Sequence, residues 1–222
     1  MKIVLCGSNR KGGELWGYVA GPKSASAGVV VLHAWWGLTP DFIDVADRLA
    51  GEGYRVVAPD LFYGETASTL EAAELLSEEM LSDAMINDVS ETVHWLRGEC
   101  GGARRKIGVV GFSLGGMLAL EAGAHGDGDA VVTFYGTTVL QPGGDFQVPV
   151  LGHFAERDPY EPEKENIVPL FERLQELQVS ATRYDYPGTG HWFFESSNKA
   201  YNPVAHHLAW QRTLHFLRES LG

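Results

Sequence analysis

The chain has 222 residues, and 45% of them are hydrophobic, which is enough to bury a sizeable core in a single domain over residues 1–222. Its 17 Lys and Arg residues against 29 Asp and Glu residues give a formal net charge of −12, which argues against nucleic acid or an anionic membrane surface as a partner. Cys6 and Cys100 form no Cys-x-x-Cys pair, so we expect no metal site and two reduced thiols in a cytoplasmic protein. The apolar stretch at residues 3–5 is too short for a signal peptide or a membrane span.

Strand and helix patterns alternate along the chain. Residues 14–20 predict an antiparallel edge strand, and apolar runs predict buried strands at 28–33, 54–59, 107–110, 129–135, 148–154 and 180–186. Helical patterns fall at 40–51, at 69–98 in two or more pieces, and at 117–124, 165–178 and 203–221. Continuous apolar strands between helices predict an α/β fold with a mostly parallel central sheet and helices on both faces. Residues 136–147 are too few for a helical lid domain, so we expect an open site.

The segment Lys-Ile-Gly-Val-Val-Gly-Phe-Ser-Leu-Gly-Gly at 106–116 carries the most specific chemical signal. An apolar run ends at a Gly-x-Ser-x-Gly pattern, and a helical pattern follows directly. Strand, sharp turn and helix form the setting in which this pattern predicts a nucleophile elbow at Ser113. The alternative is a glycine-rich phosphate loop, but Leu114 and Met117 stand where such a loop needs a cation.

A nucleophilic serine needs a base within hydrogen-bond reach, and in this fold class the base is a histidine that follows an acid in the chain. His191 is the best candidate, because it lies in a glycine-rich loop directly after the last predicted strand. Packing or surface roles are favoured for the histidines inside a predicted strand or the C-terminal helix, His153, His206, His207 and His215.

The acid should follow the strand before the last one. Asp158 lies in the loop after the predicted strand 148–154 and is favoured, with Glu156 as the alternative. Asp158 could also be an ordinary Asp-Pro turn residue, and Asp185 is expected to lie within a strand.

The oxyanion of the tetrahedral intermediate needs two preorganised N–H donors. The backbone N–H of Leu114 follows the nucleophile and is one candidate. The other is the N–H of Trp35, in the loop His-Ala-Trp-Trp-Gly at 33–37 after an early strand. Core packing is the alternative role for Trp35 and Trp36.

Short segments spread over nearly the whole chain carry a family resemblance. They are His-Ala-Trp-Trp-Gly-Leu at 33–38, Ala-Pro-Asp-Leu-Phe at 58–62, Gly-Phe-Ser-Leu-Gly-Gly at 111–116, Glu-Arg-Asp-Pro at 156–159, Gly-Thr-Gly-His-Trp-Phe at 188–193 and Tyr-Asn-Pro…Ala-Trp-Gln-Arg at 201–212. In this order they resemble the dienelactone hydrolase family of the α/β-hydrolase fold, which hydrolyses lactones and esters without a metal or organic cofactor. The resemblance implies a triad of Ser113, Asp158 and His191, with oxyanion donors at Trp35 and Leu114.

The chain departs from the family's best-known members in three ways. Those members use a cysteine where this chain has Ser113, and a Glu that controls the thiol's ionisation where it has Ala34. They also bind a substrate carboxylate with arginines, one of them four residues after the catalytic His, where this chain has Glu195. No Arg or Lys stands between Arg55 and Arg97. Anionic dienelactones are therefore expected to be poor substrates, and the chain is expected to be a serine esterase.

The sequence thus predicts a cofactor-free serine hydrolase, monomeric or homodimeric, that forms an acyl-serine from neutral, small to medium esters or lactones. Several aromatic side chains follow the catalytic segments and are expected to line the substrate pocket, although aromatics also dominate cores. Four of these aromatic residues are predicted to bind the substrate, namely Trp36, Phe112, Tyr160 and Trp192. Other functions left open are a thioesterase or peptidase on the same fold and a non-catalytic protein that binds a hydrophobic ligand.

Overall fold

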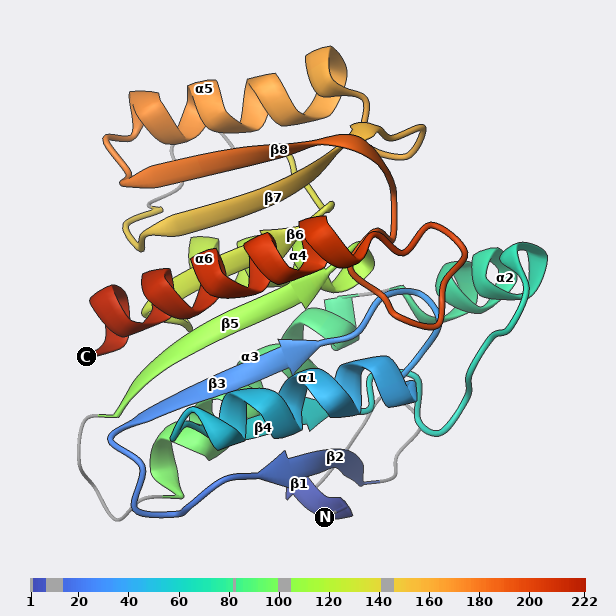
Figure 1. Ribbon diagram of the computed structural model, residues 1–222. Coiled ribbons are helices and arrows are strands. Elements are labelled where there is room, and N and C mark those ends of the chain that lie inside the picture. Colours follow the sequence, from blue (N-terminus) through green and yellow to red (C-terminus); the bar gives the residue numbers. More distant parts are fainter. Residues whose placement is uncertain (1, 7–13, 82, 100–104, 141–145) are drawn as a thin grey trace.

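The computed structural model describes residues 2–6, 14–81, 83–99, 105–140 and 146–222. Its centre is an eight-stranded sheet with the order β1-β2-β4-β3-β5-β6-β7-β8 (Figure 1). The strands are β1 (Lys2–Cys6), β2 (Leu15–Ala20), β3 (Ala27–Leu32), β4 (Arg55–Pro59), β5 (Lys106–Phe112), β6 (Ala130–Phe134), β7 (Val150–Arg157) and β8 (Ala181–Gly190). Cys100, one of the two predicted free thiols, lies outside the described residues, as does the side chain of Cys6.

The sheet is mostly parallel, as predicted. The six strands from β4 across to β8 pair in parallel, whereas β2 pairs antiparallel with both β1 and β4. The prediction of an antiparallel strand at 14–20 is confirmed, but its edge position is wrong, because β1 covers the outer side of β2. The five-residue β1 was missed because its apolar run is short and its partner strand lies beyond an intervening segment.

Helices cover both faces of the sheet, as the apolar strands require. They are α1 (Pro40–Gly51), α2 (Leu70–Met80), α3 (Asp83–Gly98), α4 (Leu114–His125), a π-helical turn η1 (Glu163–Ile167), α5 (Val168–Glu176) and α6 (Pro203–Leu221). Helices α1 and α6 pack on one face, and α3, α4 and α5 pack on the other (Figure 1). Every residue of β3, β4 and β6 is buried between these layers.

Local signals begin the helices that the sequence predicts. Thr39 precedes α1 and Pro40 occupies its first position, where a missing N–H costs nothing. At α6, Pro203 again comes first, and the Asn202 side chain accepts the N–H groups of Val204 and Ala205. The predicted helical region 69–98 is two helices, α2 and α3, as expected. Among the helices of the described ranges, none has the length and apolar character needed to cross a bilayer.

The last two strands run further than predicted. β7 continues to Arg157 and β8 to Gly190, with an irregular register between Ala155 and Arg157 that still pairs Arg157 with Gly190. The glycine-rich segment before His191 is therefore strand and not loop. Glycine lowers strand propensity, but backbone pairing with β7 overrides it here. In the connection between β6 and β7, the described residues 135–140 and 146–149 contain no helix.

Candidate active site

Ser113 occupies a strained turn between β5 and α4. Its φ of 53° and ψ of −113° lie in a region that costs a non-glycine residue about 1–3 kcal/mol. Packing imposes the turn, since a Cβ on Gly111 would lie 1.9 Å from the carbonyl oxygen of Gly115. A Cβ on Gly115 would lie 2.3 Å from the carbonyl oxygen of Leu32. Only glycine fits at 111 and 115, as the elbow interpretation of the sequence requires.

The three predicted triad residues meet in one hydrogen-bonded chain. The Ser113 Oγ lies 2.9 Å from His191 Nε2, and His191 Nδ1 lies 2.6 Å from Asp158 Oδ2. The His191 and Asp158 side chains are 3% and 2% exposed, so little water competes for their hydrogen bonds. With Nδ1–H donated to the carboxylate, Nε2 is left as the acceptor for the serine hydroxyl.

Fold topology brings these residues together. Ser113 follows β5, Asp158 follows β7 and His191 follows β8, so each stands at the carboxyl end of a parallel strand. The carboxyl ends of parallel strands lie at one edge of the sheet, which is where ligands bind in open α/β sheets (Figure 1). Asp185 lies within β8 and is half exposed, as the sequence predicted.

The carboxylate of Asp158 is held on both oxygens. Oδ2 receives the imidazole, and Oδ1 accepts the backbone N–H groups of Tyr160 at 3.0 Å and Glu161 at 3.1 Å. Glu161 is itself fixed, because its carboxylate accepts the N–H of Thr137 and the side-chain amide of Asn166. The acid is therefore oriented by its own turn. Glu156, the alternative acid, instead accepts the N–H of Gly188 and is half exposed.

The two predicted oxyanion donors lie on neighbouring segments. Leu114 is the first residue of α4, where backbone N–H groups have no intrahelical acceptor. The close approach of Gly115 to the carbonyls of Leu32 and His33 sets this helix start against the end of β3, just before Trp35. Buried His33 anchors that loop, with Nδ1 2.7 Å from the Ala34 carbonyl and Nε2 accepting the N–H of Leu61. Burial lowers the pKa of His33, which keeps it neutral.

Aromatic rings gather around the imidazole. Trp35 stacks on Trp192 with ring centroids 6.0 Å apart, and Trp36 lies 5.4 Å from Trp192. Tyr160 contacts Trp35 at 5.4 Å, Trp192 at 5.2 Å and His191 at 5.0 Å. The indole N–H groups of Trp35 and Trp192 are buried and, among the described residues, have no acceptor. This cluster forms an apolar wall with two free donors beside the triad.

Phe112 does not belong to this wall. Its side chain is fully buried and packs against Phe42, Phe134 and Phe194 on the α1 and α6 face of the sheet. The residue before the nucleophile points into the core because alternate side chains of a strand point to opposite faces. The structure thus contradicts the expectation that Phe112 lines the substrate pocket.

The sequence suggested Tyr135 only as a possible aromatic near the site, and it noted Glu195 only as a departure from the family pattern. Glu195 is 3% exposed, and its Oε1 accepts the Tyr135 hydroxyl at 2.8 Å. Burial raises the pKa of Glu195 to about 8, although the bond from Tyr135 and the nearby Trp36 indole oppose the rise. The residue four positions after His191 is therefore an inward-facing acid. Tyr135 follows β6 as Ser113 follows β5, and that placement was the signal available in the sequence.

The histidines assigned to packing or surface roles lie away from the triad. His153 is fully buried in β7 between the Tyr186 and Thr213 hydroxyls, and burial lowers its pKa to about 3. His206 hydrogen-bonds the Phe194 carbonyl from α6. His207 and His215 are exposed on α6.

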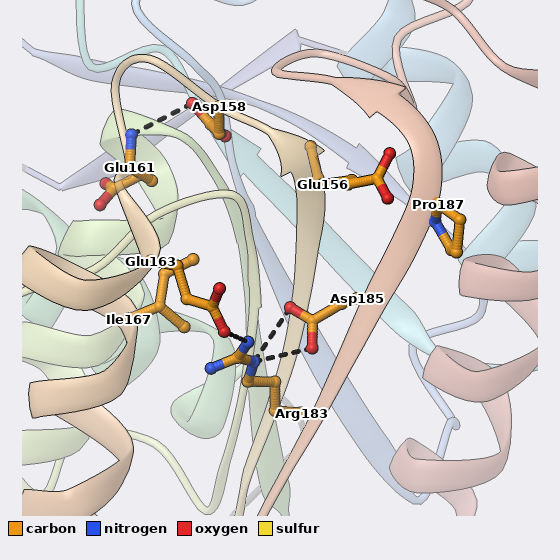
Figure 2. A pocket seen from close by; sticks show the side chains of 9 residues that line it. Glu156, Asp158, Glu161, Glu163, Ile167, Arg183, Asp185 and Pro187 are labelled. Atoms are coloured by element: carbon orange, nitrogen blue, oxygen red, sulfur yellow. Dashed lines mark hydrogen bonds and ion pairs between the residues drawn. The ribbon is translucent and has the colours of Figure 1, made fainter.

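A pocket of about 250 Å³ lies beside Asp158, between β7, η1 and β8 (Figure 2). Of the described residues that line it, Arg183 is the one cation, and it pairs with both Glu163 and Asp185. The cation of this pocket, Arg183, is therefore already neutralised by two carboxylates. Arg157, beside Asp158, points to solvent with 85% of its side chain exposed. No three His, Cys, Asp or Glu side chains in the described ranges are arranged as metal ligands.

The profile of the dienelactone hydrolase family matches residues 15–221, nearly the whole chain. The protein belongs to the dienelactone hydrolase family. It is 31% identical over 224 residues to protein usf of Aquifex pyrophilus, covering 96% of each chain. Carboxymethylenebutenolidase 1 of Cupriavidus pinatubonensis is 28% identical over 227 residues, covering 95% of this chain and 94% of that protein. In fold it resembles the butyrate-bound esterase of Thermogutta terrifontis, with a TM-score of 0.74, 16% identity, and coverage of 99% of this chain and 93% of that one. This member of the family is a hydrolase of ester or lactone type.

Proposed function

We propose that this dienelactone hydrolase family member is a serine esterase that hydrolyses neutral, small to medium esters or lactones through an acyl-serine intermediate. The observation that carries the proposal is the Ser113–His191–Asp158 chain, with contacts of 2.9 Å and 2.6 Å, on a strained elbow at the sheet edge. That arrangement has each group that nucleophilic acyl transfer needs.

In the proposed mechanism, His191 Nε2 takes the Ser113 proton as Oγ attacks the carbonyl carbon. Asp158 holds the imidazole tautomer and stabilises the imidazolium, and the N–H groups of Leu114 and Trp35 bind the oxyanion. His191 then protonates the leaving alcohol, and in the second stage it activates the water that releases the acid and regenerates Ser113.

The preference for neutral substrates rests on the charges around the triad. Glu195, where the family resemblance implies a carboxylate-binding arginine, is buried and turned toward Tyr135, and Arg183 is paired with two carboxylates. Trp35, Trp36, Trp192 and Tyr160 supply an apolar wall in place of a cation. The triad and this wall suit a neutral acyl or alcohol group better than a carboxylate.

The test is a panel of p-nitrophenyl esters and lactones, neutral and anionic, with the wild type and Ser113→Ala. We expect Ser113→Ala to lose at least about 10⁴-fold in kcat with folding kept, and the wild type to label with a fluorophosphonate at Ser113. Substantial activity in Ser113→Ala, or a preference for anionic lactones, would contradict the proposal. A folded wild type that neither turns over esters nor labels would indicate a non-catalytic binding protein.

A further inference from the structure

Tyr135 lies against the face of the catalytic imidazole. The ring centroids of Tyr135 and His191 are 4.8 Å apart, with planes tilted by 55°. The backbone of Tyr135 has a strained φ of 39°, which persists only where the surrounding structure imposes it. One such constraint is the Tyr135 N–H, which donates to the His153 carbonyl on β7 at 2.8 Å. The side chain is fully buried. A fixed, fully buried ring thus packs against the imidazole.

The hydroxyl of Tyr135 reaches past His191 to the turn that follows it. It donates to Glu195 Oε1 at 2.8 Å, and the Glu195 N–H donates to the Trp192 carbonyl at 3.1 Å. Trp192 is strained, with a φ of 50°, so the turn from 192 to 195 needs such contacts to persist. The Tyr135–Glu195 bond therefore joins the end of β6 to the segment that carries His191.

The carboxyl of Glu195 has acidic neighbours. From α1, Asp41 faces it, and Ser196 and Ser197 engage that aspartate. Across a cavity of about 10 Å³ lie three more charged or titratable groups, Asp44, Arg48 and His206. Arg48 pairs with Asp44 and hydrogen-bonds His206. No ion pair to Glu195 occurs within the described ranges.

On its other sides, Glu195 meets the Trp36 indole from the loop before α1 and the Tyr135 phenol from β6. The Asp158 carboxyl group also acts electrostatically on Tyr135. An anionic Glu195 would therefore be buried between acids, with only neutral donors to stabilise it. Neutralisation of the carboxyl avoids that cost.

We propose that Tyr135 and Glu195 form a positioning pair that holds His191 in line with Ser113 and Asp158, that Glu195 does this as the neutral acid, and that loss of its proton limits activity at alkaline pH. The inference rests on the proposed function, because it assigns His191 as the base. The pKa of about 8 agrees with the geometry. Once ionised, the carboxylate moves toward water, the turn after His191 shifts, and the imidazole loses its backing.

The experiment measures kcat and KM for a neutral ester from pH 6 to 10 in the wild type, Glu195→Gln and Tyr135→Phe. The kcat of the wild type should decline reversibly above about pH 8. Glu195→Gln, which keeps an acceptor for Tyr135 but cannot ionise, should stay within about 2-fold at pH 7 and lose the alkaline decline. Tyr135→Phe should lower kcat about 10-fold with KM nearly unchanged. This variant should also shift the alkaline decline in kcat to higher pH. In the wild type the Tyr135 O–H stabilises the Glu195 carboxylate, so its removal raises the pKa of Glu195.

Tyr186→Phe is the matched control. It also removes a buried hydroxyl with a histidine partner, His153, but its ring does not contact His191, so the pH profile should stay that of the wild type. An unchanged alkaline decline in Glu195→Gln overturns the role of the proton. A Tyr135→Phe effect on KM alone, or an equal effect of Tyr186→Phe, overturns the positioning role. Activity in Ser113→Ala would instead overturn the proposed function, so the two failures are distinguishable.

Discussion

Two buried histidines, His191 and His153, lie in different settings and have different chemistry. Both have hydrogen bonds at each ring nitrogen and both contact tyrosine rings. His153 lies inside β7 between two neutral hydroxyls, and burial lowers its pKa to about 3. His191 follows β8 at the sheet edge and faces a carboxylate and the hydroxyl of Ser113.

Under the proposed function, the difference explains why His191 and not His153 acts as the base. Burial and two hydrogen bonds immobilise the ring in both cases, but hydroxyl partners offer nothing to stabilise an imidazolium. A carboxylate on Nδ1 does, and Nε2 at the sheet edge faces the Ser113 hydroxyl, from which the proposed mechanism takes the proton. The following predictions test this contrast, from the largest expected effect to the smallest.

His191→Gln should have the largest effect on activity. Under the proposed mechanism the variant has no base for Ser113, and kcat should fall by about 10⁴-fold. Steady-state kinetics on a neutral p-nitrophenyl ester measures the loss, with circular dichroism to confirm folding. A loss below about 10-fold would remove His191 as the base.

Asp158→Asn should lower kcat by about 10³-fold or more, because the amide cannot stabilise the imidazolium and favours the wrong tautomer. Glu156→Gln is the control, since that carboxylate accepts the Gly188 N–H and does not touch His191. Its kcat should stay within about 2-fold of the wild type. If Glu156→Gln instead loses kcat and Asp158→Asn does not, Glu156 is the acid that orients His191.

His153→Gln should leave kcat nearly unchanged and cost about 1–3 kcal/mol of unfolding free energy at neutral pH, since the Tyr186 and Thr213 hydroxyls lose good partners. The folded protein resists protonation of His153 down to about pH 3, whereas the unfolded chain takes the proton near pH 6.5. His153 therefore makes its full contribution to the unfolding free energy of the wild type above pH 6.5. That contribution is lost as the pH falls toward 3.

Denaturant unfolding from pH 4 to 8 measures this dependence. The difference in unfolding free energy between the wild type and His153→Gln should become smaller at acid pH, because only the wild type loses the contribution of His153. A gap that widens on acidification would contradict the neutral buried state.

Tyr160→Ala should have the smallest effect. The ring is 42% exposed and lies over His191, Trp35 and Trp192, whereas the backbone N–H that holds Asp158 remains. KM should rise about 3-fold to 5-fold with kcat within about 2-fold, as for loss of a wall of the substrate site. Tyr184→Ala is the matched control beside His153 and should change neither parameter.

Much of the site could be predicted because its signals are local. The Gly-x-Ser-x-Gly segment has to turn sharply, and residues after successive parallel strands must meet at one edge, so chain order alone brought Ser113, Asp158 and His191 together. The edge strand β1, the full length of β8 and the inward direction of Phe112 were not predicted. Each depends on a partner far along the chain or on which face of a strand is covered.

The sequence by itself determined the alternation of strands and helices and the membership in an ester or lactone hydrolase family, and it predicts Ser113 as the nucleophile. Only the tertiary structure decided that Glu195 faces inward to Tyr135 and that His153 is held neutral. The physical reason is that strand pattern and turn chemistry are properties of neighbouring residues. The protonation state of a buried side chain instead depends on burial and on the charges that distant segments bring to it.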